Sequence, residues 1–154
     1  MLCICEELDQ AKYGLAGKVA IVEDKKAILK HTGLRSEDWL YFWDIDCRLL
    51  TGCFHSAHAE YEKIIVVYDY EVFCSEPDIR EAILFHELGH LAYPVASGEQ
   101  NLEAELNCDL HAVNNGYKNG LAIVLELLLK MSESLRNTLL ADMTKKRLEM
   151  LYTA

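Results

Sequence analysis

Apolar residues are most regularly spaced in the central and C-terminal parts of the chain. Residues 63–68 are almost continuously apolar and rich in β-branched side chains, which predicts a strand buried on both faces. From Ile79 onwards, apolar residues recur at helical spacing in a segment that begins after Ser75 and ends at Tyr93-Pro94. Further helices are predicted over residues 102–113, 120–131 and 135–152.

The first sixty residues have a weaker pattern. Residues 6–13 suit a short helix, whereas residues 19–22 and 27–29 fit either strand or helix. Residues 36–38 resemble a helix start, and the aromatic-rich segment 39–43 that follows is expected to pack in a core or an interface. The whole pattern predicts an α+β fold. A short mixed or antiparallel sheet packs against the helix that follows it, and the C-terminal half is helical.

The composition is that of one globular domain spanning residues 1–154. Apolar residues make up 51% and charged residues 26%, and no linker or repeat divides the chain. The 15 basic residues are outnumbered by 25 acidic ones, so we expect no nucleic-acid and no membrane partner. The N-terminus lacks the pattern of a secretory signal, and the most apolar segment, 121–131, is too short to span a bilayer. A cytoplasmic location is therefore expected.

The six cysteines are scattered along the chain, and none forms a C-x-x-C pair. In a reducing compartment they are expected to be free thiols that act as small hydrophobic residues. The spacing of Cys3 and Cys5 can hold a metal, but no second pair accompanies them. The other four are Cys47, Cys53, Cys74 and Cys108.

A metal site is indicated by the segment His-Glu-Leu-Gly-His at residues 86–90. His86 and His90 are four residues apart, so on a helix their imidazoles project from one face and can share a tetrahedral zinc ion. Glu87 lies next to them, where it can accept a proton from water acidified by zinc and deliver it to a leaving amine. Gly89 leaves out a side chain close to this face, which relieves crowding. The motif alone is only moderately specific.

Zinc needs a third protein ligand, and the segment 103–109 supplies candidates. Glu105 and Asp109 share a helix face, so Glu105 can ligate zinc while Asp109 accepts the distal N–H of a ligand histidine. Glu103 points about half a turn away and is the fallback ligand. His111 is a third candidate, although it lies off the face of Glu105 and Asp109.

The two motifs together, H-E-L-G-H and E-L-N-C-D, resemble the signature of the gluzincin zinc metallopeptidases. The resemblance is closest to the CAAX prenyl endopeptidases, their heat-shock zinc peptidase relatives and the short soluble minigluzincins. It covers residues 63–151 and leaves residues 1–60 unassigned. A small zincin-like metallopeptidase domain is what this resemblance implies.

By that resemblance, one zinc ion would be bound by His86, His90 and Glu105, with Glu87 as general base and acid. Asp109 would accept a hydrogen bond from the ring N–H of a ligand histidine, on the side of the ring away from the metal. Two departures matter. The transmembrane helices of the prenyl endopeptidases are absent from this sequence, so lipidated substrates are not implied.

The second departure is the missing His-Pro element, in whose place residues 142–146 stand. The group that would stabilise the oxyanion is therefore unassigned. The candidates are Arg147, Tyr117 and a histidine of the segment around His58.

These features predict a zinc-dependent peptidase of restricted specificity, acting on a peptide or protein substrate. An edge strand that pairs with extended peptide is expected within residues 51–60. One alternative is a non-catalytic zinc-binding module that recognises protein segments, against which the intact Glu87 argues. The other is a zinc hydrolase of a non-peptide amide, whose usual upstream cysteine ligand has no matching sequence around Cys74.

Overall fold

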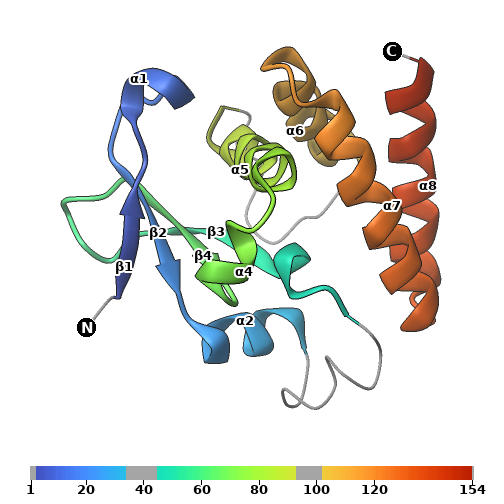
Figure 1. Ribbon diagram of the computed structural model, residues 1–154, viewed down its shortest axis with the longest axis horizontal. Coiled ribbons are helices and arrows are strands. Elements are labelled where there is room, and N and C mark those ends of the chain that lie inside the picture. The colour runs from blue at the N-terminus through green and yellow to red at the C-terminus, as the bar shows by residue number, and fades with distance from the viewer. Residues whose placement is uncertain (1–2, 34–44, 93–101, 154) are drawn as a thin grey trace.

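The computed structural model describes residues 3–33, 45–92 and 102–153. One mixed sheet has the strand order β1-β2-β4-β3 (Figure 1). The central strands β2 and β4 are parallel, whereas each outer strand runs antiparallel to its neighbour. The strands are β1 (Ile4–Glu7), β2 (Val19–Glu23), β3 (Thr51–His55) and β4 (Lys63–Val67).

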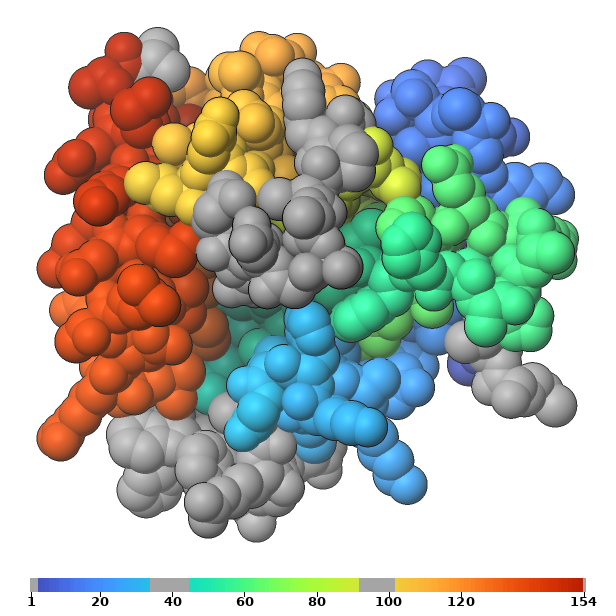
Figure 2. All heavy atoms as spheres, turned by 180° about the vertical axis from the view of Figure 1, so that it is seen from behind, coloured from blue at the N-terminus to red at the C-terminus, as the bar shows by residue number. Residues whose placement is uncertain are grey.

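Helices surround this sheet and make up the described C-terminal half. The short ones are α1 (Gln10–Tyr13), α2 (Lys25–Thr32), the 3-10 turn η1 (Cys47–Leu49) and α4 (Tyr70–Phe73). The longer ones are α5 (Pro77–Ala92), α6 (Leu102–Asn114), α7 (Lys118–Ser134) and α8 (Thr138–Thr153). In Figure 1, α5 lies between the sheet and the group formed by α6, α7 and α8. The rear view in Figure 2 shows the sheet-bearing half and the helices α7 and α8 side by side.

The predicted α+β class is confirmed, with a four-stranded mixed sheet in the N-terminal half and helices in the C-terminal half. The prediction of one helix over residues 6–13 is wrong at its start, because Glu6 and Glu7 belong to β1 and pair with β2. Pairing with a neighbouring strand outweighs weak local preference here. Residues 19–22 are strand and residues 27–29 are helix. The predictions for residues 36–43 lie outside the described residues.

Strand β4 is buried on both faces, as its sequence predicts. Ile65 and Val67 pack in the larger core cluster with Ile83 and Leu84 of α5. Val66, between them, points to the other face and packs with Ile28 of α2. This alternation follows from the two-residue period of a strand. The contacts of Ile65 and Val67 hold α5 against one face of the sheet, and α5 carries the predicted metal motif.

The three predicted C-terminal helices correspond to α6, α7 and α8, with ends that differ by a few residues. Helix α8 begins later than predicted because the Asn137 side chain accepts a hydrogen bond from the Leu140 amide, as an N-cap does. The expected strand ahead of β4 is β3, and it lies at the edge of the sheet. Over the described ranges, no helix is both long and apolar enough to cross a membrane.

Candidate metal centre

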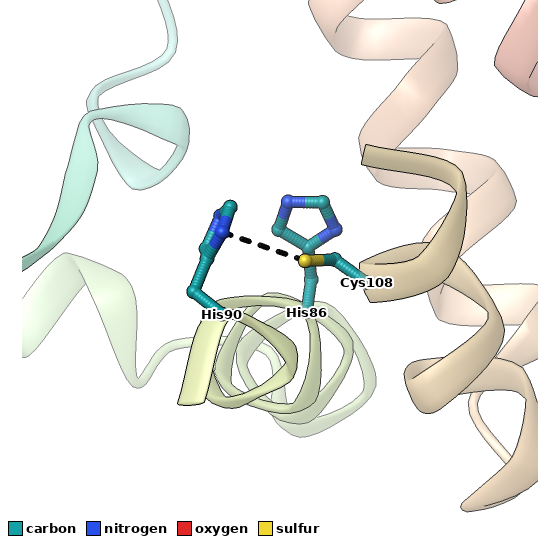
Figure 3. A group of neighbouring side chains, drawn as sticks. All are labelled: His86, His90 and Cys108. Carbon is teal, nitrogen blue, oxygen red and sulfur yellow. Dashed lines mark hydrogen bonds between the residues drawn. The ribbon is translucent and has the colours of Figure 1, made fainter. Parts of the chain in front are cut away.

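Helices α5 and α6 bring a group of metal-binding side chains together. The ligand atoms of His86, His90 and Cys108 all lie within 4.8 Å of one another, which makes this a candidate site for one metal ion. Figure 3 shows both imidazoles projecting from one side of α5 while Cys108 reaches toward them from α6. The two rings are perpendicular, with centroids 5.5 Å apart. Within the described part of the chain, this is the group that meets that distance condition.

Both ring nitrogens of His86 face carboxylates of α6. Nδ1 lies 2.9 Å from Asp109 Oδ1, and Nε2 lies 3.0 Å from Glu105 Oε2. Burial lowers the pKa of His86, but the hydrogen bonds to Asp109 and Glu105 outweigh it and raise the pKa to about 9. The two carboxylates therefore favour the charged form of the His86 imidazole.

Arg147 of α8 contacts both carboxylates that face His86. Its Nε and Nη2 each donate to Asp109 at 2.8 Å, and its Nη1 lies 3.8 Å from Glu105. Burial by itself raises the pKa of both carboxyl groups, but the hydrogen bonds and positive charges of Arg147 and His86 hold each pKa below its usual value. The polar contacts thus run from α8 through Asp109 to His86.

Cys108 is fully buried and packs against the glycine of the motif. Its Sγ lies 3.5 Å from His90 Nδ1. A Cβ at Gly89 would lie 2.8 Å from Cys108 Cα and 3.2 Å from its Sγ, so the glycine is what lets α6 approach α5 this closely. Burial, followed by the charges of Glu105 and Glu87, raises the pKa of the Cys108 thiol to about 12. These surroundings favour the neutral form of the thiol.

Glu87 lies where α5 meets the edge strand β3. The Thr51 hydroxyl donates a hydrogen bond to Glu87 Oε1 at 3.2 Å. Both residues line a cavity of about 90 Å³, together with His86 and Arg147. The apolar part of its wall is formed by Leu49, Ile83, Leu121, Val124 and Leu128. The carboxylate of Glu87 is thereby held beside both the candidate metal site and an apolar pocket.

Two sequence-predicted ligands lie apart from this centre. Glu103 is exposed on α6. The centroid of the His111 ring lies 6.0 Å from that of the Phe85 ring. Burial lowers the pKa of His111. Neither belongs to the metal-binding group. Glu105 is not a member either, although its carboxylate contacts His86 Nε2 directly.

The three candidates for the oxyanion stabiliser have different surroundings. Tyr117 stacks on Phe85 with ring centroids 5.3 Å apart, at the boundary of the hydrophobic core. His58 is exposed in the turn after β3, where its amide donates to Ser56 Oγ. Of the three, Arg147 lines the cavity, although two of its nitrogens already bind Asp109.

Two neighbours of the motif are not indicated by sequence pattern alone. The sequence predicts that Cys108 acts as a small hydrophobic residue, yet it is a member of the metal-binding group. One signal for it is Gly89, because a glycine inside a helix often marks close approach of another backbone. Thr51 gives no such signal, since its contact with Glu87 joins residues 36 positions apart.

The chain matches none of the known protein-family models with which it was compared, and searches of curated proteins and of solved structures also found no match.

Proposed function

We propose that the protein is a zinc-dependent peptidase of restricted specificity. The observation that carries this proposal is the placement of Glu87, which lines the same cavity as His86 and is anchored by Thr51. A carboxylate beside a histidine pair is the arrangement needed to move a proton between water and a leaving amine. The resemblance of the two motifs to the gluzincins supports the same assignment.

The donor set fits zinc. Two nitrogen or oxygen ligands on one tetrahedral zinc ion are about 3.3 Å apart, and His86 Nε2 lies 3.0 Å from Glu105 Oε2. His86 Nδ1 faces Asp109 instead, which is the usual outer partner of a ligating histidine. His86, His90 and Glu105 would hold the ion, and Arg147 would fix Asp109.

A bound zinc ion supplies Lewis-acid polarisation of a peptide carbonyl and makes nearby water more acidic. Glu87 would take the proton from water and pass it to the amine that leaves. Thr51 holds one oxygen of Glu87, which orients the carboxylate toward this task. Asp109 would keep the proton of His86 on Nδ1, which leaves Nε2 free to hold a metal ion.

The surroundings of Glu87 suggest the class of substrate. Strand β3 is an edge strand, and an extended peptide can add to such an edge through backbone hydrogen bonds. The adjacent cavity of about 90 Å³ is smaller than the roughly 150 Å³ apolar cavity that accepts benzene. We therefore expect a small apolar side chain next to the cleaved bond, and this requirement restricts specificity.

A second candidate function is favoured by Cys108. Structural zinc sites have four protein ligands; Cys108 lies beside the two histidines, and the Glu105 carboxylate lies 3.0 Å from His86 Nε2. A non-catalytic zinc-binding protein would use such a site without needing Glu87.

The substitution Glu87→Gln separates the two functions. We expect the variant to bind zinc in equal proportion and to cleave a peptide library about 10²–10⁴ times more slowly than the wild type. Zinc is measured by elemental analysis and cleavage by mass spectrometry. Glu103→Gln, at an exposed position of α6, is the matched control and should cleave normally. Absence of zinc from the wild type, or full cleavage by Glu87→Gln, would overturn the proposal.

A further inference from the structure

The two helices of the candidate centre offer one donor more than a catalytic zinc site needs. Catalytic sites hold zinc through three protein ligands and leave the fourth position open, whereas structural sites fill all four. Here His86, His90 and Cys108 form the metal-binding group, and the Glu105 carboxylate, 3.0 Å from His86 Nε2, is an additional donor beside it. The assignment of His86, His90 and Glu105 leaves Cys108 without a role in the proposed function.

The sulfur of Cys108 lies at a distance that suits a shared metal ion. A sulfur and a nitrogen ligand at ordinary bond lengths on one tetrahedral zinc are about 3.6 Å apart. Cys108 Sγ and His90 Nδ1 are 3.5 Å apart. Together with His86, all three ligand atoms fall within 4.8 Å of one another. Figure 3 shows the sulfur directed at the space beside the two rings.

The packing of α6 on α5 keeps the sulfur in this place. At Gly89, one residue before His90, an added Cβ would come within 3.2 Å of both the Sγ and the Cβ of Cys108. Cys108 has no exposed surface, so its side chain is held between the two helices. Contact between helices α5 and α6 therefore determines how near the thiol lies to the histidines.

We propose that Cys108 is a fourth, displaceable zinc ligand that closes the metal site in the resting protein. This inference rests on the proposed function, because both need a zinc ion at His86 and His90. On binding the ion, Cys108 would lose its thiol proton to solvent and its sulfur would become the ligand; on displacement by water or a peptide carbonyl, the sulfur would take a proton back from solvent. While this bond persists, neither water nor a peptide carbonyl can occupy the fourth position, and the peptidase is latent.

Cobalt substitution tests the sulfur bond in the full-length protein. Co²⁺ replaces zinc in tetrahedral sites, and a thiolate ligand adds a strong near-ultraviolet charge-transfer band. We expect this band in the wild type and its complete loss in Cys108→Ser, which should still bind one cobalt ion through the other three donors. Cys74→Ser, a half-buried cysteine outside the metal-binding group, is the matched control and should keep the band.

The outcomes separate this inference from the proposed function. A wild type that binds cobalt without the sulfur band overturns the role of Cys108 and leaves the peptidase proposal standing. A wild type that binds no metal overturns both. If folded Cys108→Ser, checked by circular dichroism, binds no cobalt, then Cys108 is indispensable and its displaceability is overturned. A peptide-cleavage rate in Cys108→Ser above that of the wild type supports latency, whereas an equal rate contradicts it.

Discussion

Helix α5 carries two buried polar clusters that differ in what they can bind. In the first, which we call the α1 cluster, Glu81 accepts hydrogen bonds from the Tyr13 hydroxyl at 2.8 and 3.0 Å and from Lys12 Nζ at 3.2 Å. In the second, the α6 cluster, His86 lies between Asp109 and Glu105. The first joins α5 to α1 beside the sheet, and the second joins α5 to α6 and α8 away from it.

Burial and perturbed acidity do not distinguish these clusters. Glu81 is 8% exposed and Asp109 is 5% exposed. Burial and the contact with Glu81 raise the pKa of Tyr13 to about 12, just as the pKa of His86 is raised to about 9. What differs is the type of donor, since the α6 cluster adjoins a second imidazole, a thiol and a cavity. Donor type and access, rather than ionisation alone, mark the candidate site.

The largest expected effect is on the α6 cluster. Asp109→Ala removes both hydrogen bonds of the buried Arg147 and leaves it only the Glu105 carboxylate at 3.8 Å, which should lower the free energy of unfolding by about 3–5 kcal/mol. Zinc affinity should fall about 10–100-fold as well, because His86 Nδ1 loses its acceptor. Denaturant unfolding and a zinc titration measure the two quantities.

The control for this substitution is Asp142→Ala, at an exposed position of α8. We expect it to change the free energy of unfolding by less than about 0.5 kcal/mol. Equal losses in the two variants would show that the contacts between Asp109, Arg147 and His86 do not stabilise the protein.

Zinc itself should act on one cluster only. At a free zinc concentration about 100 times Kd, binding stabilises the native state by about 2.7 kcal/mol. The melting temperature should therefore rise with zinc in the wild type and in Tyr13→Phe, and by clearly less in His90→Ala, which loses one donor. Calorimetry with and without zinc measures this. A rise in His90→Ala as large as in the wild type would place the ion elsewhere.

The two clusters also differ in how far sequence alone can reveal them. His86, Glu87 and His90 are contiguous on one helix, so their spacing fixes a shared face before any tertiary structure is known. Glu105 and Asp109 follow the same rule on α6. The contact between Tyr13 and Glu81 spans 68 positions and involves common residue types, so no local pattern points to it.

The elements of the fold also differ in whether a local sequence pattern reveals them. The buried strand β4 and the long helices were predictable because burial gives each a clear period. The pattern does not predict β1 and leaves β2 open between strand and helix, since their identity depends on pairing with each other and with β4, which lies far along the sequence. Arg147 was named only as an oxyanion candidate, and its contact with Asp109 depends on how α8 packs on α6.

A smaller effect is expected at the contact of α5 with α6. Helix propensity alone favours Gly89→Ala by up to about 1 kcal/mol. The added Cβ would meet the backbone of Cys108 at 2.8 Å, so α6 must shift, and we expect a net destabilisation of about 1–3 kcal/mol. Denaturant unfolding gives the sign directly, and a stabilised variant would contradict the close packing. The sulfur band of the cobalt form should weaken in parallel.

The smallest expected effect is on the α1 cluster. Tyr13→Phe removes the hydroxyl that binds Glu81 but leaves Lys12 Nζ at 3.2 Å and Arg80 Nε at 4.0 Å, so the carboxylate keeps two cationic partners. We expect a loss of about 1 kcal/mol in the free energy of unfolding, with zinc affinity and peptide cleavage unchanged. Unfolding, zinc titration and cleavage are compared in the same preparation. If zinc affinity falls with Tyr13→Phe, the two clusters are coupled along α5, and the separation between a structural and a metal-binding cluster is wrong.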